Sequence, residues 1–408
     1  MSARKNKLGT SSKYLMNTNG ATYGVPTVGT ELETPKNLQQ INVNQTKTQE
    51  NFNGIQTFAL QGGGACAGAT GETDTMTTEL GNIFEYFILG GGQTIKTFPK
   101  TATGIDVTMD ATDDEGVEIW QGNSAYGKHA YVIGTDVPFY AEAKFSVSVV
   151  DKFDELMIGF RKVEAGAAAY TSYTDYCAIN LDNGTVKAKC GVGGADSSYT
   201  CTDAITNAQY LIARLEYDET AGLAKMIALA NEMKACFNGH IKDVTQHTNG
   251  ADPNVVTAAD AYDLATLKTL IADLLTMYDT NHDADSEAAL PSYHAAQETG
   301  DHSLTSAAAP TTLALCGTRL NDFREKFIAH EADATNHAIP SLYTPTHSNA
   351  GCMTLKVGCN TTTLTEVSNN PGYTFTAALT VIPFFRQLHD ATAASVISLQ
   401  SWEVGPIS

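Results

Sequence analysis

The sequence predicts a mainly β protein, an antiparallel sandwich or barrel that is interrupted by an inserted domain of three helices. Two observations predict this fold class. Apolar and polar residues alternate on both sides of the middle of the chain, as they do in half-buried strands. In the middle, a Leu-Ala pair recurs three times, with an aromatic residue fourteen positions after each Leu, which marks a repeated helical unit.

Residues 1–72 are expected to form an extended N-terminal arm followed by a Gly-rich joint. Residues 1–60 show no sustained periodicity and too few large apolar side chains to bury a core of their own, and residues 61–72 read QGGGACAGATGE. The arm carries cations and has no acid before Glu31. These cations are candidate assembly residues that would dock on an acidic neighbouring subunit, with a solvated terminus as the alternative. They are Arg4, Lys5, Lys7 and Lys13.

Residues 73–222 are predicted to form the first part of the β-sandwich. Along 141–149 and again along 211–217, apolar residues alternate with Glu, Lys, Ser or Arg, which places one face of each strand on a core. Further short strand candidates are separated by Gly, Asp and Asn turn signals, as in antiparallel sheets. They are residues 105–109, 116–120, 130–133, 156–161, 177–181 and 185–189.

Residues 223–345 are predicted to form an inserted helical repeat domain. The repeats begin at Leu223, Leu264 and Leu313, and in each the positions 0, +3, +7, +10 and +14 are apolar. This spacing gives one apolar stripe along a helix of about four turns. Three such helices can bury their stripes against one another in a small bundle.

Residues 346–408 return to the strand pattern and are predicted to form the second part of the sandwich, with strands at 353–357, 373–377, 378–385 and 396–404. Four strands alone would leave two exposed edges. We therefore expect them to complete the sheets begun before residue 222, so that the sandwich is discontinuous and the helices are inserted at a hairpin tip.

Charge and hydropathy exclude several classes of protein. The net charge of −20 argues against binding to nucleic acid or to an anionic membrane surface. No apolar stretch approaches the ~20 residues of a membrane span, and the charged start lacks the apolar region of a signal peptide. The chain is expected to be soluble and not exported by the usual route.

The eight cysteines form no CxxC pair, so no zinc knuckle is expected. Buried free thiols are the favoured interpretation. Disulfides between Cys190 and Cys201, or between Cys352 and Cys359, are the alternatives.

The histidines of the repeats are the strongest candidates for metal ligands. His240 with His247, and His330 with His337, share a seven-residue spacing, while the middle repeat has His282, His294 and His302. Two rings seven residues apart on one helix are about 10.5 Å apart along its axis, too far for one zinc ion with ~2 Å bonds. We expect no metal and no cofactor, and interpret the rings as hydrogen-bonding partners at helix–loop junctions. A metal bound by several repeats, and ring stacking between subunits, are the alternatives.

Catalytic motifs are absent from the sequence: there is no P-loop, no GxSxG and no dinucleotide fingerprint. The acidic run from Asp110 to Glu118 is interpreted as a solvated turn, with a calcium loop as the alternative. Glu142 and Asp154 lack the facing pair of carboxylates that a glycosidase needs. The chain is predicted not to be an enzyme, with no catalytic or cofactor-binding residues.

The order of several passages resembles a family of bacteriophage virion structural proteins with a concanavalin-A-like (lectin-type) jelly-roll domain. The passages are residues 104–110, 112–119, 139–145, 158–165, 381–385 and 399–406. The helical block is similar to the Asn/Gly-x-His repeat of phage particle and baseplate proteins, although here it lies inside the sandwich.

The resemblance implies a jelly-roll sandwich on the surface of a virion. We expect a non-enzymatic virion structural protein of the capsid-decoration or fibre type, made in the host cytoplasm and anchored through its arm. Its partners would be copies of itself, as a homo-oligomer, and other virion proteins, with no nucleic acid and no membrane. The alternative is a glycan-binding receptor-recognition module of a phage tail or fibre, which rests on fold analogy.

Overall fold

The computed structural model of this chain describes the strands of the β-sandwich and the helices of the insert. The described residues are 48–51, 59–61, 73–77, 83–90, 102–108, 114–121, 130–244, 254–283, 302–333, 341–390 and 395–407. The four candidate assembly residues, Arg4, Lys5, Lys7 and Lys13, lie outside them.

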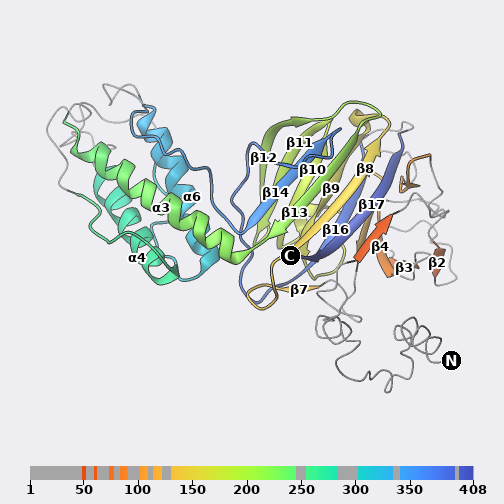
Figure 1. The fold of residues 1–408 in the computed structure, drawn as a ribbon, viewed down its shortest axis with the longest axis horizontal. Coiled ribbons are helices and arrows are strands. Elements are labelled where there is room, and N and C mark those ends of the chain that lie inside the picture. Colours follow the sequence, from red (N-terminus) through yellow and green to blue (C-terminus); the bar gives the residue numbers. More distant parts are fainter. Residues whose placement is uncertain are drawn as a thin grey trace, which may run out of the picture. The chain divides into compact units, whose positions relative to one another are not determined.

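Two antiparallel sheets enclose the main hydrophobic core (Figure 1). The first has the order β1 (Thr48–Asn51), β17 (Ile397–Pro406), β8 (Phe139–Val147), β13 (Tyr210–Tyr217), β14 (Met353–Cys359) and β15 (Thr365–Glu366), with β5 (Ile105–Asp106) also paired to β17. The second has the order β12 (Ala195–Ala204), β11 (Thr185–Val192), β10 (Asp175–Asp182), β9 (Phe153–Lys162), β16 (Thr380–His389), β6 (Gly116–Gln121), β4 (Ile83–Leu89), β3 (Thr73–Thr77) and β2 (Ala59–Gln61), with β7 (Tyr131–Val132) on β16.

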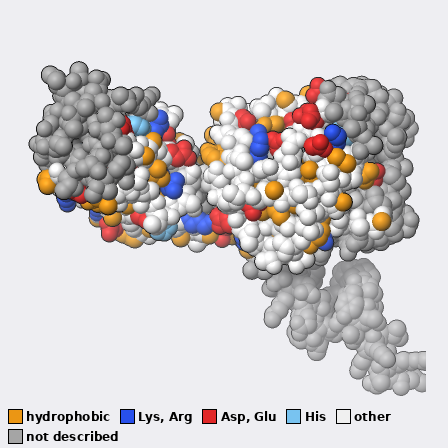
Figure 2. All heavy atoms as spheres, turned by 90° about the horizontal axis from the view of Figure 1, so that it is seen from above, with side chains coloured by type: hydrophobic (Ala, Val, Ile, Leu, Met, Phe, Trp, Pro, Cys, Tyr) orange, Lys and Arg blue, Asp and Glu red, His pale blue; other side chains and the backbone are white. Residues whose placement is uncertain are grey.

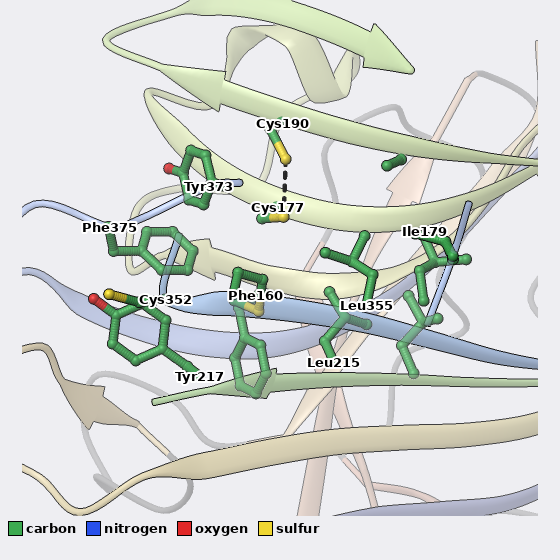
Figure 3. Close-up of a cluster of buried hydrophobic side chains, with 14 of the residues drawn as sticks. Phe160, Cys177, Ile179, Cys190, Leu215, Tyr217, Cys352, Leu355, Tyr373 and Phe375 are labelled. Atoms are coloured by element: carbon green, nitrogen blue, oxygen red, sulfur yellow. Dashed lines mark hydrogen bonds between the residues drawn. The ribbon is translucent and has the colours of Figure 1, made fainter. Parts of the chain in front are cut away.

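The alternation seen in the sequence determines which side chains enter this core. In β8, Ala141, Ala143 and Phe145 are buried between the sheets, while the residues between them are half-buried on the outer face. Phe145 meets Phe385 of the opposite sheet edge to face, with ring centroids 5.5 Å apart. Figure 3 shows the same layer further along, filled by side chains from both sheets. The period-two pattern therefore predicted the inner faces correctly.

Strands that follow the helices occupy interior positions in both sheets. β14 pairs with β13 along its whole length, β16 lies between β9 and β6, and β17 lies between β1 and β8. The predicted fold class, a mainly β antiparallel sandwich that is discontinuous in sequence and carries inserted helices, is confirmed.

One predicted strand is absent and several observed strands were missed: β1 and β2 fall in the expected arm, and β3, β4, β12 and β15 were not among the candidates. Residues 373–377 are not a strand: Tyr373 and Phe375 are buried, but they follow Gly372 at φ +67° and make only one backbone bond to β14, from the Met353 amide. β12 was missed because it is an exposed strand of Ser, Thr and Asp at the end of its sheet, without an apolar face.

The described residues of the insert contain three helical segments: α3 (Glu219–Lys242), α4 (Leu264–Leu275) continued by the π-helical segment η3 (Thr276–Asp283), and α6 (Leu313–Glu331). α3 begins four residues before the predicted start because Asp218 caps it, accepting bonds from the amides of Thr220 and Ala221. Asp263 and Thr312 cap the other two. No helix in the described ranges is long and apolar enough to cross a membrane.

All seven described cysteines are free, as the sequence favoured, and five of them are buried. Cys190 does not face Cys201, the partner that the sequence offered. It lies opposite Cys177 on the neighbouring strand, with 2.9 Å between the two sulfurs (Figure 3). The hairpin register decides this pair, because directly opposed residues of antiparallel strands point to the same face.

The register between β13 and β14 predicts that the sandwich folds without the helices. Tyr217 and Met353 are direct partners, and the Asp218 amide donates to the Cys352 carbonyl at 3.0 Å. Replacing residues 219–351 with Asn-Gly should therefore close a two-residue hairpin. We expect an all-β circular dichroism spectrum and one cooperative melting transition. A matched deletion joined by Pro-Pro, which cannot form this turn, should be less stable; an aggregated Asn-Gly product would contradict an independently folding sandwich.

Candidate metal centre

The three helices of the insert run parallel, with their C-terminal ends together (Figure 1). Residues at the same offset from the first Leu of each repeat contact one another. At +14, the rings of Phe237, Tyr278 and Phe327 meet edge to face, with centroids 6.2, 6.0 and 6.4 Å apart. One turn later the repeat histidines meet as well. Two successive layers in the same order require parallel helices.

An acid at offset +9 of each helix holds an irregular linker in the groove between helices. Each carboxylate accepts the backbone amide of a linker Thr, which satisfies backbone groups that have no sheet or helix partner. The bonds join Asp273 to Thr257 at 2.8 Å, Asp322 to Thr305 at 2.8 Å, and Glu232 to Thr346 at 2.9 Å. Because Thr346 follows the third helix and Glu232 belongs to the first, the three repeats close into a ring.

Asparagine side chains fix the other side of these linkers. Asn231 of α3 accepts from the Ala261 amide at 2.8 Å and donates to the Ala261 carbonyl at 3.0 Å. Asn321 of α6 makes the same pair of bonds to Ala350, at 2.9 and 3.1 Å. Within the first and third repeats, the linker is therefore bound both by the helix that precedes it and by the next helix around the ring.

The π-helical turn of the middle repeat compensates for one extra residue before its histidine. His240 and His330 lie seventeen residues after the first Leu of their repeats, whereas His282 lies eighteen after its own. A π-helical turn accommodates one extra residue in an α-helix. Because η3 spans Thr276–Asp283, it absorbs that residue and brings His282 level with the other two rings.

Three imidazoles, one from each repeat, converge on a single point in the centre of the ring. The Nε2 atoms of His240, His282 and His330 lie 3.0, 3.1 and 3.2 Å from one another. All three side chains are fully buried, with exposed fractions of 0%. They form the one group of three or more metal-ligating side chains found in the described part of the chain.

A carboxylate stands behind one of the three rings. Nδ1 of His240 lies against Oε1 of Glu331, a side chain that is 1% exposed. The other oxygen of Glu331 accepts the Tyr343 amide at 3.0 Å, and the Tyr343 hydroxyl donates to Asp243 at 2.8 Å. Burial raises the pKa of Glu331, against the hydrogen bond from the Tyr343 amide and the nearby His330. This arrangement fixes the His240 ring with Nε2 directed at the centre.

The structure brings together one histidine from each repeat, as the alternative of a metal bound by several repeats requires; the favoured interpretation, hydrogen bonding at separate helix–loop junctions, had kept them apart. The seven-residue spacing excluded a metal shared by two histidines of one helix, and His247 and His337 lie outside the described residues. It did not exclude one histidine from each of three helices. His302 lies beside the His330 ring, with centroids 6.0 Å apart, and His347 is exposed and paired with Glu232.

The acidic residues considered as catalytic groups or as calcium ligands are not part of this histidine cluster. Glu118 was expected in a solvated turn, but it is in strand β6 and fully buried, so that expectation was wrong. It accepts bonds from Arg161 at 2.7 Å, Tyr173 at 2.8 Å and Arg386 at 3.2 Å. Because these partners are 43 or more residues away in sequence, no local sequence pattern could indicate them.

Of the two carboxylates weighed as glycosidase acids, Glu142 is paired with Arg214 at 3.1 Å and Asp154 is exposed. Both side chains point away from the core, Glu142 from β8 of the first sheet and Asp154 from β9 of the second, so they lie on opposite outer faces and form no facing pair.

Comparison with known proteins adds little. No family model matches the chain, and no curated protein matches it. Among solved structures, the chain is similar to the carbohydrate recognition domain of Emp47p, with 8% sequence identity and a TM-score of 0.33 over 85% of this chain and 100% of that chain. A likeness this distant carries no argument about ligands, and the fold assignment rests on the two sheets described above.

Ring closure by Glu232 predicts an acid-sensitive insert. Partial burial opposes ionisation of this carboxyl, but hydrogen bonds from Thr346 and His347 outweigh it and lower its pKa from 4.5 to about 2. Because the folded-state pKa is the lower one, the stability that the carboxylate contributes is complete above the unfolded value and is lost as the pH falls from about 4.5 towards 2.

We expect Glu232→Gln to destabilise the insert at pH 7 by roughly 0.5–1.5 kcal/mol and to flatten the pH dependence in that window. Denaturant unfolding at several pH values, followed by the helical circular dichroism signal, measures both effects. Glu325→Gln, on an exposed face of α6, is the matched control. An unchanged acid dependence in the Glu232 variant would contradict ring closure by this residue.

Proposed function

We propose that the chain is a non-enzymatic structural component of a bacteriophage virion, of the capsid-decoration or fibre type. The β-sandwich would be its body and the helical ring a rigid module. The virion assignment is supported by the resemblance of the sequence passages described above. The structural role is supported by buried ion pairs among the described residues.

The proposal that the chain is not an enzyme rests on the ion pairs that neutralise its buried carboxylates. A catalytic carboxylate must reach its substrate and exchange a proton or attack. Glu118 instead faces Arg161 and Arg386, and Arg386 is also ion-paired with Glu155. Both guanidinium groups are fully buried. Charges neutralised inside the protein in this way serve packing and specificity of the fold.

The segment that follows β9 covers the outer face of the second sheet, where these ion pairs lie. Val163, Ala167 and Tyr170 pack on an apolar cluster of the outer face. Arg386 donates to the carbonyl of Ala167 at 2.8 Å, so the same buried arginine that neutralises the carboxylates also holds the covering segment. A sheet face occupied by its own chain in this way favours a structural body over a substrate cleft.

Surface charge supports assembly through the basic arm. On the face seen in Figure 2, acidic and basic side chains are interspersed and hydrophobic ones are scattered among polar atoms. The whole chain has a net charge of −20, whereas the start of the arm is cationic. Arg4, Lys5, Lys7 and Lys13 can therefore dock on the acidic body of another copy or of another virion protein, by charge complementarity.

The arm predicts a specific failure of assembly. Residues 48–51 and 59–61 of the predicted arm form strands β1 and β2 of the two sheets, so the truncation has to stop before them. Removing residues 1–46 should leave the melting transition of the sandwich unchanged while abolishing incorporation of the chain into particles. A full-length variant in which Gln replaces Arg4, Lys5, Lys7 and Lys13 keeps the length of the arm but removes its positive charge. This variant should be incorporated much less than the wild type. Particle composition by mass spectrometry, with cryo-electron microscopy of the particles, measures both.

Normal incorporation of the truncated chain would contradict anchoring through the arm. Binding of that same chain to a host-surface glycan would then favour the receptor-recognition alternative. Wild-type chain that is absent from particles altogether would contradict the virion role itself.

A further inference from the structure

We infer that His240, His282 and His330 bind one divalent transition-metal ion of the zinc class through their Nε2 atoms, and that this ion ties together the C-terminal ends of the three helices. The inference concerns the insert alone and does not depend on a role in a virion.

Hydrogen bonds among the three rings cannot account for their arrangement. Each Nε2 atom carries either a proton or a lone pair, both in the plane of its ring, so it either donates or accepts. Three such atoms, each 3.0–3.2 Å from the other two, form three contacts. At least one contact must then join two lone pairs or two protons, which repel each other. A cation at the centre removes this conflict because all three lone pairs can point at it.

The spacing of the nitrogens agrees with metal coordination. Bonds of ~2.0–2.1 Å separate two nitrogens by about 3.3 Å around a tetrahedral ion and by about 2.9 Å around an octahedral ion. The observed distances of 3.0, 3.1 and 3.2 Å lie between these two values. An ion with bonds of this length would lie about 1 Å out of the plane of the three nitrogens. The three histidines then occupy one face of its coordination sphere, and water or a small anion can complete it.

The surroundings favour positive charge. His240, His282 and His330 all lie in the last turn of their helical segments. Because the segments are parallel, three C-terminal ends, each with a partial negative charge, meet at the centre. The carboxyl group of Glu331 lies against Nδ1 of His240 within the same buried region. A carboxylate that accepts the second ring proton of a ligating histidine is the usual outer partner of a metal-bound imidazole.

The donor atoms select the class of ion. Imidazole nitrogens suit zinc and the neighbouring divalent transition metals, whereas calcium and magnesium prefer oxygen ligands. The ligands are 42, 48 and 90 residues apart, so one ion would connect all three repeats. The layer beneath is closed by Phe237, Tyr278 and Phe327. The site therefore fits a structural ion that holds the ring shut.

Zinc binding is tested on the full chain, stripped with a chelator and then titrated with zinc alone. We expect one zinc ion per chain by elemental analysis after desalting, nitrogen ligands at ~2.0–2.1 Å by X-ray absorption, and a higher melting temperature of the helical signal. A chain that takes up no zinc, or that binds it through sulfur, overturns the inference. The measurement needs no particle, so its failure is distinguishable from failure of the virion proposal.

Matched variants assign the ligands. His282→Gln should lower zinc affinity more than ~100-fold, and Glu331→Gln, which alters a positioning residue, roughly 10–100-fold with the nitrogen signature retained. Glu325→Gln changes an exposed residue of α6 that lies outside the triad and should leave zinc affinity unchanged. Equal zinc affinity in wild type and a folded His282→Gln overturns the inference. If that variant does not fold, the zinc titration of the wild-type chain still decides.

Discussion

The pairing of β13 with β14 is the constraint on which the insert depends. Tyr217 and Met353 are adjacent across the sheet, although the whole helical domain separates them in sequence. The chain must therefore leave the sandwich and return to it at the same place. A row of three repeats would end far from its start, whereas a ring of three ends beside it. The bonds from Glu232 of the first helix to Thr346 and His347 of the last linker make that return.

Ring closure has an electrostatic consequence. Repeats related by rotation around a common axis run in the same direction, so their helix dipoles align instead of cancelling. The C-terminal partial charges then gather at one end of the bundle, where the backbone carbonyls also lack helical partners. That is the end at which His240, His282 and His330 converge. A bound cation would offset the charge that the parallel arrangement concentrates, which relates the candidate metal centre to the architecture that produces it.

The sandwich also buries charged side chains and pairs them with one another. Around β6, β9 and β16 the second sheet is covered on both faces, by the first sheet and by the segment after β9, so polar side chains of the outer face are removed from water there. Glu118 is ion-paired there with Arg161 and Arg386. Arg386 is also ion-paired with Glu155 and donates to backbone carbonyls of the covering segment. Such a network is costly to break because each partner would leave an uncompensated buried charge. The insert and the body thus both bury ionisable groups at the points where separate segments meet.

The sequence by itself determined the local structure of this protein. The alternation along β8 and β13, the apolar stripes of the three repeats and the return of strands after residue 345 follow from periodicity, because a strand or an amphipathic helix has to place its apolar side chains on one face. Tertiary structure alone decided which distant residues meet. A spacing argument could compare His240 with His247, but not with His282 and His330, whose approach depends on parallel packing and on one π-helical turn. Glu118 looked like part of a solvated turn for the same reason: its arginine partners come from strands far along the chain, and contacts of that kind leave no local pattern.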